Sequence, residues 1–233
     1  MQISVLSGGA AQGLLEAVGD AFERQTGYRI AGSFGAVGAM RAKLLAGSPA
    51  DLLILTSAMI SDLARQGQVE AASAEDIGVV RTALAVPSGE QAPRIDSAEA
   101  LGQSVRAASA LFFPDPQQAT AGIHFAKVLA ALGIAAPELA QKANIHANGK
   151  AAMGALAQAG GGRALGCTQA TEILSTPGVR LIGPLPAPHE LATVYSVGLS
   201  VRAPAPEAAR ALKALLTAPA TRDLRARLGF EPL

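Results

Sequence analysis

His124 is the side chain in this sequence best suited to exchange a proton with a bound molecule. It stands three residues after Ala121, in the first turn of a helix expected over "ATAGIHFAKVLAALG". An unperturbed histidine titrates near neutral pH, so His124 could serve as a general base or donate a hydrogen bond to a carboxylate. A histidine packed on an adjoining helix, or exposed at the rim of a site, fits the same position. The sequence leaves both interpretations open.

Arg41 and Arg81 could neutralise a carboxylate, because a guanidinium can grip both oxygens at once. Thr56, Thr168 and Gln169 stand at predicted strand ends and offer neutral donors. Each arginine could instead be an ordinary surface or structural residue, and each threonine could simply cap a helix. These five side chains therefore indicate binding chemistry without naming a ligand.

The stretch "ISVLSGGAAQGLL" near the start of the chain passes from an apolar strand through small residues into a helical pattern. Such a turn presents backbone N–H groups to an anion. It is not a P-loop, because Leu14 and Leu15 stand where Lys and Ser or Thr are required. It is not a dinucleotide fingerprint either, because Ala10 replaces the second glycine. A helix N-terminus for a small anion, or a tight turn without a ligand, is what remains.

Composition excludes several other classes of site. The chain has 233 residues, a net charge of +1, 3% aromatic residues and one cysteine. These values argue against a nucleic-acid surface, an intrachain disulfide and a cysteine-based metal site. The histidines are far apart in sequence, so we expect no metal and no cofactor, and no apolar run is long enough to span a membrane. Cys167 is expected to be a small core residue.

Strand-like and helical segments alternate along the whole chain, which predicts an α/β fold with mostly parallel sheets. The expected strands include 2–6, "YRIAGSF" and "ADLLILT", and the expected helices include 10–26, 57–66 and 150–158. Four or five turns share one design, in which a strand ends in small residues that open a helix. Ligands of such sheets bind beyond the carboxyl ends of the strands.

Two longer β-like segments, 77–86 and 191–201, suit a double crossover between two lobes. We therefore expect a discontinuous first lobe, 1–80 plus 196–233, and a second lobe, 81–195, with a ligand cleft between them. Helix N-termini facing such a cleft would favour a small anion held by amides and helix dipoles.

The chain resembles the type II periplasmic binding proteins, specifically the molybdate-binding receptors of ABC transporters. The resemblance covers nearly the whole chain. It is carried by "ISVLSGGAAQGLLEAVGDAFERQTGYRI", "SFGAVGAMRAKLLAGSPADLLILTS", "PDPQQATAGIHFAKVLAALGI" and "RLGFEPL". It implies a two-lobed fold with two crossover strands as hinge, and reversible capture of a small anion.

The ligand positions of that family carry over only in part. Ala10 and Val37 stand where serine hydroxyls are expected, and Gln169 stands where a tyrosine is expected. The alanine amide is kept at Ala121, and a further backbone donor falls near Gly149–Ala151. Because each lost charge-assisted bond is worth roughly 1.5–3 kcal/mol, these replacements weigh against molybdate and favour an organic acid. An aconitate isomerase-like branch of the family acts on such a ligand without a metal.

Three functions stay open from the sequence: a solute receptor that could serve an ABC permease, an aconitate isomerase-like enzyme with His124 as its base, and a ligand sensor without chemistry. Met1 leads directly into strand residues without a leader, so the sequence as it stands predicts a cytoplasmic protein, or a periplasmic one if a leader has been removed. The expected ligand contacts are Ser7, Gly8, Gly9, Ala10, Ala36, Val37, Thr56, Arg81, Thr120, Ala121, Gly122, His124, Gly149, Thr168 and Gln169.

Overall fold

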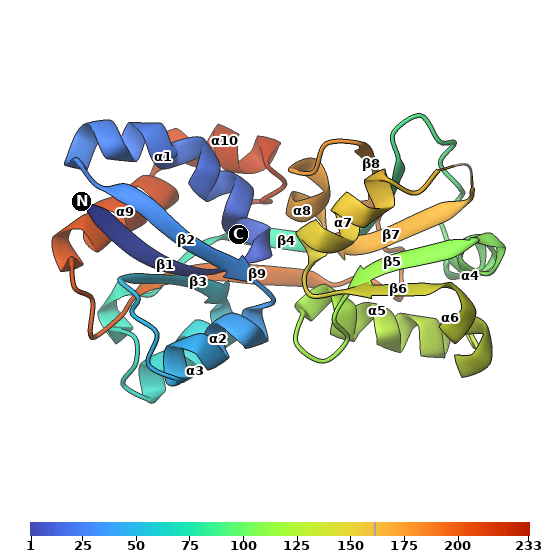
Figure 1. Ribbon diagram of the computed structural model, residues 1–233, viewed down its shortest axis with the longest axis horizontal. Helices are drawn as coiled ribbons and strands as arrows, with labels where there is room; N and C mark the ends of the chain where they lie inside the picture. Colours follow the sequence, from blue (N-terminus) through green and yellow to red (C-terminus); the bar gives the residue numbers. More distant parts are fainter. Residues whose placement is uncertain (161) are drawn as a thin grey trace. The chain divides into compact units, whose positions relative to one another are not determined.

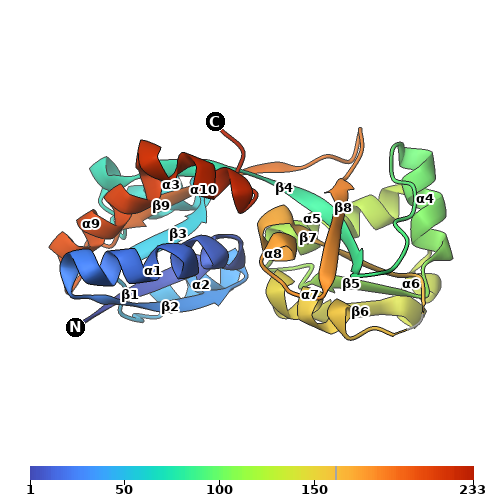
Figure 2. The same ribbon diagram turned by 90° about the horizontal axis from the view of Figure 1, so that it is seen from above.

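The computed structural model describes residues 1–160 and 162–233, and its internal contacts divide them into two units (Figures 1 and 2). Unit 1 consists of Met1–Val80 and Thr193–Leu233, and unit 2 of Arg81–Ala192. The chain therefore passes between the units twice, once within strand β4 and once within strand β9. The sequence had placed the return at 195/196 rather than at 192/193.

Unit 1 is built on a sheet in the order β2-β1-β3-β9. Strand β1 runs parallel to β2 and β3, and β3 runs antiparallel to β9. The elements of this unit are β1 (Gln2–Gly8), η1 (Gly9–Ala11), α1 (Gln12–Thr26), β2 (Arg29–Gly35), α2 (Val37–Leu45), β3 (Leu52–Thr56), α3 (Ser57–Arg65), η2 (Ala71–Ser73), the first part of β4 (Glu75–Pro87), most of β9 (Ala192–Leu199), α9 (Pro206–Thr217), η3 (Pro219–Thr221) and α10 (Arg222–Arg227).

Helix α1 shows why this unit folds as its sequence predicts. Its apolar residues recur at helical spacing, and Leu14, Leu15, Val18 and Phe22 are all buried against the sheet. The helix ends where Gly27 adopts a φ of 73°, a left-handed conformation that glycine takes without strain, and its N–H donates to the Glu23 carbonyl. Helix α1 lies on one side of the sheet, and α2 and α3 lie on the other (Figure 1).

Asp51 joins two distant segments of unit 1. Its carboxylate is buried and accepts hydrogen bonds from the Ser4 N–H at 2.7 Å and the Ala205 N–H at 2.6 Å. These donors lie in the first strand and directly before α9. Asp51 therefore links the first strand to the segment that leads into α9.

Replacing Asp51 by alanine leaves both N–H groups without that acceptor. We expect the free energy of unfolding to fall by roughly 2–4 kcal/mol, measured by chemical denaturation. Asp62→Ala is the matched control, because Asp62 pairs with Arg65 on the exposed surface of the same unit. That change should alter the free energy by less than about 1 kcal/mol. Equal effects of the two substitutions would contradict the role given to Asp51.

Unit 2 is built on a sheet in the order β8-β4-β7-β5-β6. Strand β4 runs antiparallel to β7 and β8, whereas β5 runs parallel to β6 and β7. Besides the second part of β4, its elements are α4 (Ala98–Ala107), β5 (Ala110–Pro114), α5 (Thr120–Ala131), α6 (Ala136–Lys142), β6 (Ala143–His146), α7 (Gly149–Ala157), β7 (Ala164–Gln169), α8 (Ala170–Leu174) and β8 (Val179–Pro184).

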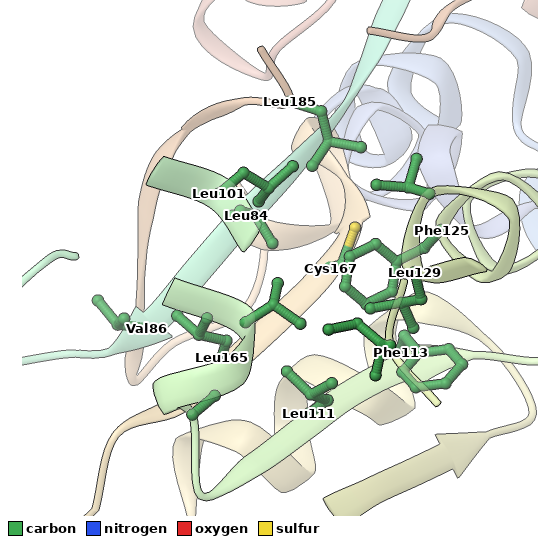
Figure 3. Close-up of a cluster of buried hydrophobic side chains, with 14 residues drawn as sticks. Leu84, Val86, Leu101, Leu111, Phe113, Phe125, Leu129, Leu165, Cys167 and Leu185 are labelled. Atoms are coloured by element: carbon green, nitrogen blue, oxygen red, sulfur yellow. The ribbon is translucent and has the colours of Figure 1, made fainter. Parts of the chain in front are cut away.

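Alternate residues of β4 serve the two faces of the unit 2 sheet. Leu84 and Val86 belong to a cluster that includes Phe113, Phe125 and Cys167 (Figure 3). Phe113 and Phe125 meet edge to face, with ring centroids 5.5 Å apart. Ala83 and Ala85 instead contribute to a second cluster whose other members come largely from α7. Helices α5 and α7 therefore cover opposite faces of the same sheet.

The α/β fold predicted from the sequence is confirmed, with mixed parallel and antiparallel strands flanked by helices. One boundary differs from the prediction. The helix expected to begin near Thr168 begins at Ala170, because Thr168 and Gln169 still pair with Ala83 and Thr82 in the sheet.

Candidate functional site

Two helix N-termini of unit 1 follow neighbouring strand ends. Strands β1 and β2 end at Gly8 and Gly35, which are paired in register. The helices η1 and α2 begin directly beyond them, and no side chain caps either one. Uncapped N-terminal N–H groups and the helix dipole together favour an anion. The predicted contacts at these two termini are Gly8, Gly9, Ala10, Ala36 and Val37.

Gly8 is required by close packing. A Cβ atom added to it would lie 2.8 Å from Val37 Cγ1 and 3.3 Å from Tyr195 Cε1. Tyr195 is a buried residue of β9 that pairs with Thr56 in the sheet. The missing side chain at position 8 thus lets the α2 N-terminus approach the end of β1.

Two hydroxyl groups predicted to contact a ligand are engaged within unit 1. The Ser7 hydroxyl donates to the Gly8 carbonyl oxygen at 2.8 Å and is fully buried. Thr56 caps α3, because its hydroxyl oxygen accepts from the Met59 N–H at 3.3 Å. The backbone amides of η1 and α2 are therefore better anion donors in this unit than either hydroxyl.

Helix α5 presents an uncapped N-terminus in unit 2. It begins at Thr120, and its N-cap residue Ala119 offers no side-chain oxygen. Gly122 brings the first turn onto the end of β5, since a Cβ there would lie 2.2 Å from the Pro114 carbonyl oxygen. Thr120, Ala121 and Gly122 therefore place N–H groups beyond the carboxyl end of β5.

Helix α7 is capped from within the chain. Asn148 Oδ1 accepts from the Ala151 N–H at 2.9 Å, and the Asn148 carbonyl accepts from the Ala152 N–H at 3.1 Å. The N–H groups of Gly149 and Lys150 donate to the carboxyl group of Glu172. The predicted contacts Gly149 and Thr168 are thus both directed at Glu172, because the Thr168 hydroxyl also donates to it, at 2.5 Å.

Glu172 is 5% exposed, and its carboxyl group receives a further hydrogen bond from the Gln169 N–H. Burial raises the pKa of Glu172, whereas the Thr168 hydroxyl and the three N–H donors act to lower it. Three of the four partners are N–H groups, which can only donate, so they favour the carboxylate form.

His124 is half-buried in α5, and its ring is oriented by the backbone of a distant loop. Its Nε2 atom lies 2.8 Å from the His189 carbonyl oxygen. A carbonyl oxygen only accepts, so Nε2 carries the proton, and in the neutral ring Nδ1 holds the lone pair. Any proton transfer by His124 would therefore use Nδ1.

The remaining polar candidates of unit 2 lie along β4 and β7. Arg81 is half-buried at the point where β4 enters the unit, next to Thr82. Thr82 pairs with Gln169 across the sheet, and both side chains are buried. Among the described residues, the Thr82 hydroxyl has no hydrogen-bond partner. Arg41, in contrast, lies on α2 of unit 1, half-buried in its second turn.

Metal ligation finds no support in the part of the chain that the structure describes, where no group of three His, Cys, Asp or Glu residues gathers. Cys167 points into the apolar cluster of unit 2 (Figure 3), and burial raises the pKa of its thiol well above the usual value. A neutral buried thiol is a poor nucleophile and metal ligand.

Sequence reasoning missed Glu172, Asn148, Thr82 and Tyr195. An asparagine before a helical pattern is a recognisable capping signal, so Asn148 could have been found. Glu172 could not, because no spacing rule connects a residue of α8 to the N-terminus of α7. Thr82 and Tyr195 lie within long β-like segments whose pairing partners the sequence does not specify.

Parallel strands whose ends lead into uncapped helix N-termini, in two units joined by two chain crossings, define an α/β solute-binding protein. The chain belongs to the family of bacterial extracellular solute-binding proteins, whose family model matches residues 3–231.

Several individual proteins are similar to this chain. An aconitate isomerase of Pseudomonas sp is 28% identical over 216 residues, which is 90% of this chain and 80% of that protein. The periplasmic molybdate-binding protein of Azotobacter vinelandii superposes with a TM-score of 0.79 at 18% identity, covering 98% of both chains. The sulfate-binding protein SubI of Mycobacterium tuberculosis H37Rv gives 0.72 at 17% identity, covering 100% of this chain and 87% of that one. Both of these structures share the fold of this chain.

Within the two described stretches, 1–160 and 162–233, no helix is both long and apolar enough to cross a membrane.

Proposed function

We propose that this protein reversibly binds a small organic anion through backbone amides at helix N-termini. One observation carries the proposal: η1, α2 and α5, which directly follow or lie just beyond the ends of the parallel strands β1, β2 and β5, have no side-chain cap. By contrast, Thr56 caps α3, and Asn148 together with Glu172 caps α7. The uncapped termini are the ones that retain N–H groups for a ligand.

The residues beside the uncapped termini favour a ligand that contains carbon. Ala10 and Val37 are buried apolar residues at the starts of η1 and α2, and Ala121 is buried in the first turn of α5. A tetrahedral inorganic oxyanion needs donors on all sides, and unpaired oxygens against such side chains would cost affinity. A carboxylate bonded to a carbon skeleton satisfies both the amides and the apolar neighbours.

The test is a thermal-shift screen of the purified protein against molybdate, tungstate, sulfate, phosphate, cis- and trans-aconitate, citrate and malonate. A ligand present at 100 times its dissociation constant stabilises the folded protein by about 2.7 kcal/mol. We expect one or more of the polycarboxylates to raise Tm. A response to molybdate or tungstate alone would reject the organic-acid proposal, and no response to any of these anions would reject anion binding as a whole.

A second candidate function is isomerisation of a small unsaturated polycarboxylate by an allylic proton shift. Two observations favour it: the similarity to an aconitate isomerase, and the orientation of His124 by the His189 carbonyl. In such a reaction His124 Nδ1 would accept a proton from one carbon and return it to another as the double bond moves. The proton that leaves one carbon returns to another and the double bond moves in the opposite sense, so the step needs no oxidant or reductant.

If the protein is such an enzyme, His124→Gln should lower kcat for interconversion of cis- and trans-aconitate by about 100-fold or more, because it removes the base. His189→Ala is the matched control. The backbone carbonyl that accepts the hydrogen bond from Nε2–H of His124 is still present in this variant. Turnover should therefore stay within about threefold of the original. Turnover that survives in His124→Gln would remove His124 from the mechanism, and absence of turnover in the unaltered protein would reject the enzyme.

The receptor form of the proposal includes an ABC-type permease as the partner and export of the chain as its setting. Membership in a family of extracellular solute-binding proteins supports this form. Fractionation of cells that express the natural gene provides the test. Recovery of the protein from the periplasm would support a receptor, and recovery only from the cytoplasm would favour the enzyme or a sensor.

A further inference from the structure

We propose that Glu172 determines the ligand specificity of unit 2, acting as a built-in anion at the N-terminus of α7. Its carboxylate occupies the place that a ligand's negative group would otherwise take there. Unit 2 is then left with the α5 N-terminus for the anionic group of its ligand. This inference rests on the proposed binding of an organic anion and adds to it a limit on the ligand's charge.

The first N–H groups of α7 bond to side chains of the chain itself. The N–H groups at the start of a helix have no carbonyl partner within the helix. In α7 the Ala151 group donates to Asn148 Oδ1, and the Gly149 and Lys150 groups donate to Glu172, whereas the Ala152 group makes the first bond of the helix, to the Asn148 carbonyl. The N–H groups of residues 149–151 are therefore occupied, although the helix dipole still favours a negative charge.

The Glu172 carboxylate fits closely between Gly149 and Thr168. A Cβ atom on Gly149 would lie 2.0 Å from Glu172 Oε2 and 2.1 Å from Thr168 Oγ1. Glycine at position 149 is therefore what lets the Glu172 carboxylate reach the helix. Thr168 completes the arrangement from the end of β7, with its hydroxyl 2.5 Å from the same oxygen. Residues from three elements thus form a closed anion site that the chain fills itself.

The charge of Glu172 acts on a ligand bound at the α5 N-terminus. Helices α5 and α7 follow β5 and β6, which are paired in register up to Pro114 and His146, so both termini lie beyond one edge of the unit 2 sheet. A fixed negative charge at α7 repels additional negative charge on a ligand bound at α5. At a separation of about 10 Å and an effective dielectric of about 20, one unit charge changes affinity on the order of tenfold. Glu172 should therefore disfavour more highly charged ligands.

The built-in anion is tested first without reference to the natural ligand. Glu172→Ala removes four heavy atoms, the same number that acetate contains, and keeps the donors in place. We expect this variant to lose roughly 5–10 °C of Tm. Acetate should restore most of the loss in a saturable way, whereas acetamide, its neutral counterpart, and chloride at equal ionic strength should not. The unaltered protein should not respond to acetate in the same range.

The outcomes of the rescue experiment separate the explanations. Rescue by acetate and not by acetamide supports a site that requires negative charge. Equal rescue by both compounds, or no rescue of a folded Glu172→Ala protein, would overturn the built-in anion. If Glu172→Ala does not fold, refolding yield in acetate compared with acetamide gives the same discrimination.

Specificity is tested with Glu172→Gln, which keeps the size of the side chain and removes its charge. The probes are propane-1,3-dicarboxylate and propane-1,2,3-tricarboxylate, which differ by one carboxylate. We expect the ratio of their dissociation constants to shift on the order of tenfold toward the tricarboxylate. If Glu172 were purely structural, the substitution would weaken the binding of both probes equally. An unchanged ratio of their dissociation constants would overturn the specificity role. Failure of both probes to bind the unaltered protein would instead count against the proposed function, while the acetate experiment would still decide the status of Glu172.

Discussion

Thr120→Pro should weaken binding of the anion that stabilises this protein by about 10- to 100-fold, the loss expected from one charge-assisted hydrogen bond of roughly 1.5–3 kcal/mol. Thr120 is the first residue of α5, a position at which proline fits the helix and removes only an N–H group. The preceding residue, Ala119, has φ −98° and ψ 130°, which is the extended conformation that a following proline requires. The substitution therefore deletes a backbone donor with little strain.

Thr120→Ala is the control that makes this prediction specific. Alanine keeps the N–H group and removes the side-chain hydroxyl, so affinity should stay within about threefold of the original if the amide is the donor. Isothermal titration of both variants with the strongest anion of the thermal-shift screen gives the comparison. Equal losses in the two variants would assign the contact to the hydroxyl, and no loss in either would exclude the α5 N-terminus as a binding element.

The fold could be predicted from the sequence because its signals are local. The apolar spacing of α1, the left-handed Gly27 that ends it, and the buried run of β3 are each readable without knowledge of the rest of the chain. Helix α4 was not predicted, although Ser97 caps it by accepting from the Ala100 N–H. Its signal lies in a stretch of mixed polarity, where capping alone is weak.

The candidate site was predicted only in part. Helix starts that offer backbone donors are local features of the sequence, whereas several side-chain contacts join residues that are far apart in it. The N-termini of η1, α2 and α5 follow from strand, turn and helix patterns that occupy a dozen residues each. At α7, whether the Gly149 and Lys150 N–H groups are open depends on a distant residue. Glu172 contacts Gly149 although α7 and β7 separate them in the sequence. The carbonyl that orients His124 belongs to residue 189. Such pairings arise from packing and leave no periodic trace in the sequence.

Gly122→Ala should strongly destabilise unit 2. The new Cβ would lie 2.2 Å from the Pro114 carbonyl oxygen and 2.3 Å from that of Asp115. Both are backbone atoms, so neither can rotate away, and the first turn of α5 would have to withdraw from the end of β5. We expect the free energy of unfolding to fall by roughly 3 kcal/mol or more. Chemical denaturation measures the change.

Gly154→Ala provides the matched control, because it adds the same methyl group to a helical glycine of the same unit. Position 154 lies in α7, and a Cβ there meets no atom within 4 Å. Alanine is the better helix former by up to about 1 kcal/mol, so this variant should be slightly more stable. The two substitutions thus predict opposite signs for one chemical change. A loss in Gly122→Ala should also displace the Thr120 and Ala121 amides and so weaken anion binding. If Gly122→Ala lost stability but kept full affinity for the anion, the close packing of α5 on β5 would not be needed for ligand binding.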